Sequence, residues 1–167
     1  DGKQHGKGKS LSAKGDVYEG DWKDGKEDGN GKVSWPNGDV YEGDVKDGKP
    51  HGKGTLTFAD GDVYEGDVKD GKQHGTQTEW HENGNKKGEG EKVDGKQTGT
   101  WTFWHENGHK KQEAEFVNGE QHGKESEWYE NGQKKEEGNY KDDKEDGLFT
   151  SWYENGQKKL ESTFKDG

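Results

Sequence analysis

The chain has 167 residues and a formal net charge of −11, and only 20% of its residues are hydrophobic. So few apolar side chains, more than half of them aromatic, argue against a thick two-layer core, and no run approaches the roughly 20 apolar residues of a membrane-spanning helix. The absence of cysteine excludes a disulfide, a thiolate metal ligand and a thiol nucleophile.

Two internal repeats divide the chain. Tyr-Glu-Gly recurs at an even spacing, at 18–20, 41–43 and 64–66, and Glu-Asn-Gly recurs at a slightly longer one, at 82–84, 106–108, 130–132 and 154–156. We therefore expect three 23-residue units over residues 1–70 and four 24-residue units over residues 71–167, joined in one continuous sheet. The chain opens at Asp1-Gly2-Lys3 and closes at Asp166-Gly167, at the same point of the repeat.

Each 23-residue unit predicts a β-hairpin, because two alternating runs flank a glycine-containing turn. In the third unit the turn is Asp60-Gly61. Side-chain alternation places one set of residues on the same face of that hairpin: Gly54, Leu56, Phe58, Tyr64, Gly66 and Val68. The charged residues between them point to the other face, as in an antiparallel sheet with one solvated side.

The 24-residue units predict the same hairpin with different residues. Trp101 and Phe103 alternate before Asn107-Gly108, a turn in which both residues tolerate positive φ, and Ala114 and Phe116 follow on the return strand. The whole chain is therefore predicted to be all-β, a single-layer antiparallel meander of about fourteen strands in an elongated, twisted array.

Two units depart from the pattern by carrying polar residues at positions that are apolar elsewhere. Ser10 and Ser12 predict a frayed first unit, and Gln77 and Glu79 predict a weak joint at the fourth. Arginine, methionine and isoleucine are absent, which fits a designed or consensus-built sequence as well as a piece of a natural repeat protein.

The segment from Tyr41 to Gly54, Tyr-Glu-Gly-Asp-x-Lys-Asp-Gly-Lys-x-His-Gly-x-Gly, resembles the MORN repeat. The sequence Trp-Tyr-Glu-Asn-Gly-Gln-Lys-Lys, at 128–135 and 152–159, resembles the related YwqK-type repeats of bacterial antitoxins. The resemblance implies a single-layer hairpin array that acts as a scaffold, an assembly platform or a peptide-binding groove. Its second half also implies toxin neutralisation as an alternative.

No catalytic, cofactor or metal site is expected. Equivalent histidines such as His51 and His74 lie about 10 Å apart across two strand spacings, too far to share a zinc ion. The carboxylates recur with the same neighbours in every unit, whereas catalysis needs one asymmetric pocket. The negative charge opposes nucleic-acid binding, and membrane binding is not expected.

The sequence therefore predicts a non-enzymatic scaffold that presents an aromatic face to a protein or peptide partner, because a single sheet has no second layer to cover that face. The candidate aromatic face consists of Trp35, Tyr41, Phe58, Tyr64, Trp101 and Phe103. An alternative is end-to-end self-assembly into a filament through exposed edge strands, since no polar cap is recognisable at either end.

Overall fold

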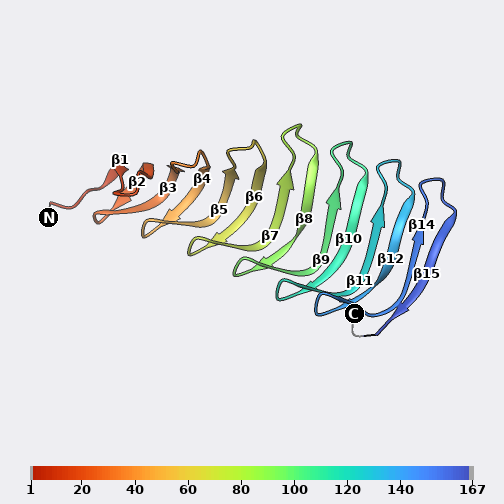
Figure 1. Ribbon diagram of the computed structural model, residues 1–167. Coiled ribbons are helices and arrows are strands. Elements are labelled where there is room, and N and C mark those ends of the chain that lie inside the picture. Colours follow the sequence, from red (N-terminus) through yellow and green to blue (C-terminus); the bar gives the residue numbers. More distant parts are fainter. Residues whose placement is uncertain (1, 166–167) are drawn as a thin grey trace.

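The computed structural model describes residues 2–165, and it forms one antiparallel sheet in which each strand pairs with the next along the chain. Figure 1 shows a curved row of hairpins running from the N-terminus to the C-terminus, with turns along two long edges. The predicted single-layer meander is confirmed. The strands are β1 (Gly6–Leu11), β2 (Val17–Lys23), β3 (Lys26–Ser34), β4 (Val40–Lys46), β5 (Lys49–Thr57), β6 (Val63–Lys69), β7 (Lys72–Trp80), β8 (Lys86–Val93), β9 (Lys96–Trp104), β10 (Lys110–Val117), β11 (Glu120–Trp128), β12 (Lys134–Lys141), β13 (Lys144–Glu145), β14 (Gly147–Trp152) and β15 (Lys158–Phe164).

The structure has fifteen strands where about fourteen were predicted, because β13 and β14 together take the place of one. The interruption falls at Asp146, whose N–H donates to the carbonyl of Asn139 at 2.8 Å, and at Gly147, which has a φ of 88°. Asp1 and the Asp166-Gly167 pair, which complete the repeat phase in the sequence, lie outside the described residues.

The two edges of the sheet use different turns. Along one edge, both residues of each Asp-Gly turn have positive φ, for example 49° at Asp47 and 78° at Gly48, as a two-residue type I′ hairpin requires. Along the other edge only the glycine does so. Gly108 has a φ of 83°, and its N–H donates to the carbonyl of His105, as in a type I turn followed by a bulge. The hairpin at Asn107-Gly108 is confirmed, but Asn107 does not adopt positive φ.

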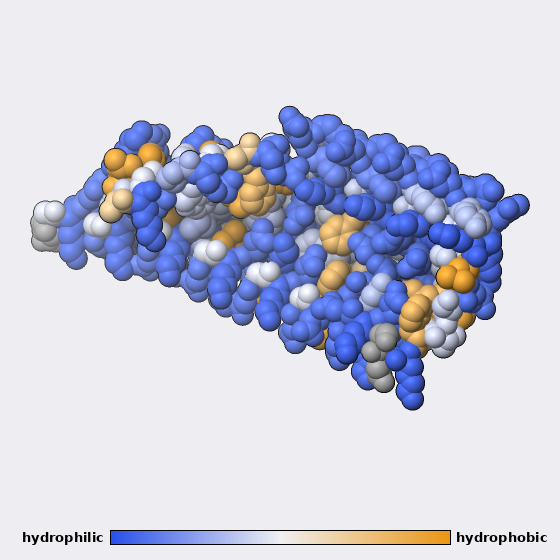
Figure 2. Space-filling model, in the orientation of Figure 1, coloured by the Kyte–Doolittle hydropathy of each residue, from blue (hydrophilic) through white to orange (hydrophobic). Residues whose placement is uncertain are grey.

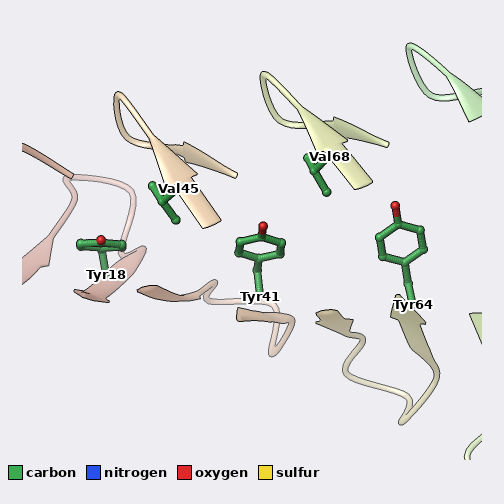
Figure 3. Close-up of a cluster of buried hydrophobic side chains, with 5 residues drawn as sticks. All are labelled: Tyr18, Tyr41, Val45, Tyr64 and Val68. Carbon is green, nitrogen blue, oxygen red and sulfur yellow. The ribbon is translucent and has the colours of Figure 1, made fainter. Parts of the chain in front are cut away.

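Tyrosine rings form the core of the first three repeats, on what we call the tyrosine face, the face that carries Tyr18, Tyr41 and Tyr64. Figure 3 shows the three rings in a row, with Val45 and Val68 directed toward them from other parts of the strands. The Tyr41 hydroxyl donates to the carbonyl of Asp44 at 2.8 Å, and its ring is 2% exposed. Burial raises the pKa of Tyr41 to about 12. The rings thus bury apolar surface on this face of the sheet, as a second layer does in other folds.

Glycines make room for these rings. Gly43 pairs with both Gly31 and Gly54, so a row of glycines crosses the sheet beneath the tyrosines. A Cβ atom at Gly54 would collide with the ring of Tyr41. The repeated glycine is therefore a requirement of the core rather than of a turn.

In the last four repeats the buried residue moves to the outgoing strand of the hairpin. The residues at this position occur once in each repeat and are all buried: Gln77, Trp101, Glu125 and Phe149. The rings of Trp101 and Phe149 lie over Gly90 and Gly138 of the preceding strands, and the Trp101 indole N–H donates to the carbonyl of Glu91 at 2.9 Å.

The two arrangements meet at Gly66, where Tyr64 and Gln77 share one space. A Cβ atom at Gly66 would lie 2.8 Å from the Tyr64 hydroxyl and 3.0 Å from the side-chain oxygen Oε1 of Gln77. The Gln77 amide nitrogen donates to the carbonyls of His74 and Gly75 at 2.8 and 3.0 Å. Gln77, one of the two polar residues from which a weak joint was predicted, is therefore enclosed, with its amide nitrogen hydrogen-bonded and its side-chain oxygen without a hydrogen-bond partner among the described residues.

Candidate functional site

The six residues predicted to form an aromatic face differ widely in exposure. Tyr41, Tyr64 and Trp101 are buried and belong to the core. Phe103 stacks on Trp101, with ring centroids 5.8 Å apart, and Trp35 packs against the tyrosine cluster, so both are only partly exposed. Phe58 is 36% exposed. The accessible part of the predicted face is thus Trp35, Phe58 and Phe103.

A larger set of rings continues the positions of Trp35 and Phe58 along one edge of the tyrosine face. In each of these repeats the N–H of the ring-bearing residue donates to the carbonyl four residues later, for example from Trp35 to Asp39 at 3.0 Å and from His105 to His109 at 2.9 Å. We call this set the outer aromatic row: Trp35, Phe58, His81, His105, Tyr129 and Tyr153. The regular spacing of these positions can be read from the sequence. Because the rings are of four types, however, the positions do not stand out as one aromatic set.

Part of the outer aromatic row also links neighbouring repeats. His81 Nε2 lies 3.1 Å from the carbonyl oxygen of Trp104, and the Tyr129 hydroxyl donates to the carbonyl of Trp152 at 2.9 Å. Since a carbonyl oxygen only accepts, His81 carries a hydrogen on Nε2. Among residues 2–165, no group of three or more histidine, aspartate or glutamate side chains is placed to hold a metal ion. The hydrogen bond from His81 to the Trp104 carbonyl joins two repeats.

The turns on the same edge are linked in the same direction. The Asn83 side-chain amide donates to the carbonyl of Glu106 at 3.0 Å, and Asn107 makes the equivalent bond to Glu130. Asn131 bonds to Glu154 in the same way, so the Asn-Gly turns of the fourth, fifth and sixth repeats are each fastened to the turn of the next repeat. These bonds fix the spacing of the outer aromatic row from His81 onward.

The opposite face, which we call the charged face, carries ion pairs between neighbouring strands. In the first repeats Lys9 pairs with Glu19, and Lys32 pairs with Glu42 at 2.7 Å. In the fourth, fifth and sixth repeats a lysine ammonium group also lies over a tryptophan ring of the next repeat, as Lys110 does over Trp128 at 5.2 Å. On the side of the molecule drawn in Figure 2, whichever face it belongs to, the surface is mostly hydrophilic and hydrophobic residues gather in small separate patches.

The buried Glu125 leads to a testable prediction about the core. Its strand partner is Ala114, whereas the rings of Trp101 and Phe149 lie over glycines. We expect Glu125→Phe alone to gain little, because the Ala114 Cβ occupies the space of a ring. In a double-mutant cycle followed by urea unfolding, Ala114→Gly and Glu125→Phe should couple favourably by about 1–2 kcal/mol. Additive effects would contradict this account of the pairing.

Comparisons with known families cover most of the chain. The MORN repeat model matches residues 1–17, 18–40, 41–63 and 64–76. The model described as a MORN repeat variant matches residues 73–91, 97–118, 121–142 and 145–166. No curated protein matches the chain significantly. No helix among the described residues is long and apolar enough to cross a membrane.

Proposed function

Because the chain belongs to the MORN repeat family, we propose that it is a non-enzymatic scaffold that binds a protein or peptide segment along its tyrosine face. MORN repeats are generally non-enzymatic scaffold repeats, and proteins that contain them generally act in protein interactions. The continuous sheet gives such a partner a long, regular surface.

The outer aromatic row is the observation that carries this proposal. It places one ring in each of six consecutive repeats, at intervals of about 10 Å set by two strand spacings. Phe58 and Tyr153 are 36% and 51% exposed. Aromatic side chains are enriched in protein interfaces, where they bury a large area at a low cost in conformational entropy. A segment lying across the strands would meet the rings in succession.

Selection from a random peptide library displayed on phage tests this proposal directly. We expect Phe58→Ala to weaken the binding of a selected peptide by about tenfold or more, which corresponds to about 1.4 kcal/mol. The matched control is Val117→Ala, an exposed apolar residue on the charged face. Equal affinities of both variants for the peptide, with unchanged circular dichroism, would exclude the tyrosine face as the binding surface.

End-to-end self-assembly, the alternative predicted from the sequence, gives a different result. Light scattering behind size exclusion would then report a mass that increases with protein concentration. A constant mass near 18.7 kDa, together with a selected peptide that depends on Phe58, is the result expected for a peptide-binding scaffold.

A further inference from the structure

A pocket of about 220 Å³ lies on the tyrosine face of the last two repeats, where β12, β13, β14 and β15 meet. Its apolar lining comes from Phe149, Leu160 and Phe164. The rings of Phe149 and Phe164 meet edge to face, with centroids 5.4 Å apart, so this wall is fixed by packing. The carboxyl groups of Glu136 and Glu145 line the same pocket.

Further negative charge surrounds these two carboxylates. Glu127 lies directly opposite Glu136 on the paired strand, and the buried Glu125 is the next residue on the tyrosine face of that strand. Lys135 pairs with Glu127 at 2.7 Å, and the Gln112 amide donates to Glu125.

Glu136 and Glu145, in contrast, have no salt-bridge partner within residues 2–165. Burial, and then the charges of Glu127, Glu125 and Glu145, raise the pKa of Glu136. Lys135 opposes this shift only as the smallest of the causes, so an apolar pocket with two carboxylates that lack a salt-bridge partner opens on the tyrosine face.

We propose that this pocket binds the basic side chain of a lysine or arginine in the partner segment, with the aliphatic stem against the phenylalanines and the cationic group between Glu136 and Glu145. This assignment rests on the proposed function, which supplies the partner segment that carries the basic side chain. Lysine and arginine commonly bury their stems while the charged group meets polar partners. The carboxylates are not grouped closely enough to hold a metal ion, which favours an organic cation.

The position of the pocket suits this role. The same two repeats carry Tyr129 and Tyr153 of the outer aromatic row, on the same face. A segment that lies along the row can therefore place a basic residue in the pocket. The negative charge would select such a residue over an uncharged one, because two partly buried carboxylates without a salt-bridge partner attract a cation more strongly than a neutral donor.

Titrations with small probes test the pocket without any peptide. We expect n-butylammonium and n-propylguanidinium to shift the amide NMR signals of residues around Gly147 and Phe149 in a saturable way, whereas n-butanol should not. Comparing the two cations shows whether a lysine-like or an arginine-like group fits better. Glu136→Gln/Glu145→Gln should weaken binding about tenfold or more. This variant should remain folded, because it removes repulsion between like charges.

The matched control is Glu113→Gln on the charged face, where the carboxylate is paired with Lys110. It should leave probe binding unchanged. Equal binding by wild type and the double variant, or an equal response to n-butanol, would overturn the proposal.

Binding should also weaken as the pH falls through the raised pKa of Glu136, earlier than for an ordinary glutamate. The titratable groups that interact with Glu136 are Glu125, Glu127, Lys135, Tyr140 and Glu145. Binding that stays constant until ordinary carboxylates protonate would contradict the role of Glu136.

The two proposals can fail separately. Probe binding that depends on Glu136 and Glu145, without any selected peptide, would support the pocket and contradict the peptide scaffold. A selected peptide that depends on Phe58, with no response of the protein to the cations, would support the peptide scaffold and contradict the pocket.

Discussion

Replacing Trp101 with alanine should lower the free energy of unfolding by about 3–5 kcal/mol, the range measured for truncating large buried aromatic side chains. The Trp101 ring is fully buried over Gly90, stacks on Phe103 and lies 5.2 Å from the Lys92 ammonium group. In a single-layer sheet no second layer can collapse into the space left behind. Urea unfolding followed by circular dichroism measures the loss.

Trp104→Ala is the matched control for this prediction. Trp104 comes from the same strand but lies on the charged face, where it is partly exposed and Lys86 lies 5.1 Å from its ring. Its truncation should cost only about 1 kcal/mol, mainly through the lost cation–π contact. Similar losses for the two variants would mean that Trp101 does not anchor the core.

Replacing Gly43 with alanine should destabilise the protein by about 3 kcal/mol, at the upper end of the range for overpacking. An ideal Cβ at Gly43 would lie 2.5 Å from the Cα of Gly54 and from the carbonyl oxygen of Lys53, and 2.7 Å from the Tyr41 hydroxyl. Two of these atoms are backbone, so the neighbouring strand has to move. Thermal unfolding should show a markedly lower midpoint.

Gly88→Ala tests whether any strand glycine has this effect. The nearest atoms to a Cβ at Gly88 are ring carbons of Phe103 at 3.3 and 3.4 Å, and a side chain can adjust more easily than a strand. We expect a loss within about 1 kcal/mol, the usual cost of a minor packing change. A loss as large as that of Gly43→Ala would mean that the close backbone contacts at Gly43 do not explain its effect, since alanine is intrinsically the better strand residue.

Much of the fold could be predicted because the repeat period and the alternation of side chains are both written in the sequence. Alternation places Tyr41, Gly43 and Val45 on one face, and their pairing across β3, β4 and β5 confirms it. Alternation does not reveal how deeply each side chain is buried. Trp35 and Tyr41 share that face, but only the tyrosine lies over glycines and is buried.

The buried position of the last four repeats shows what a sequence pattern conceals. Gln77, Trp101 and Glu125 occupy the same place in successive hairpins, but their side chains have no chemistry in common. Gln77 fits because Tyr64 already fills part of the space, and Glu125 faces an alanine instead of a glycine. Each choice depends on a neighbouring strand, which only the paired structure identifies.

The links between repeats were hidden for a similar reason. His81 and Trp104 are far apart in the sequence, and their contact requires that two hairpins lie side by side with a particular offset. Sequence spacing argued against a metal shared by equivalent histidines, but it could not identify the carbonyl oxygen to which His81 bonds. The candidate pocket likewise combines residues of four strands, so no single sequence motif predicts it.

The order of the strands has a mechanical consequence. Each hairpin is bonded only to its neighbours, and the hydrogen bonds between strands run along the length of the array. Tension between the two ends would therefore peel hairpins away one after another instead of shearing the whole sheet. Each released repeat would extend to about 80 Å, at roughly 3.4 Å per residue. The protein would lengthen under load in nearly equal steps, as an extensible tether does.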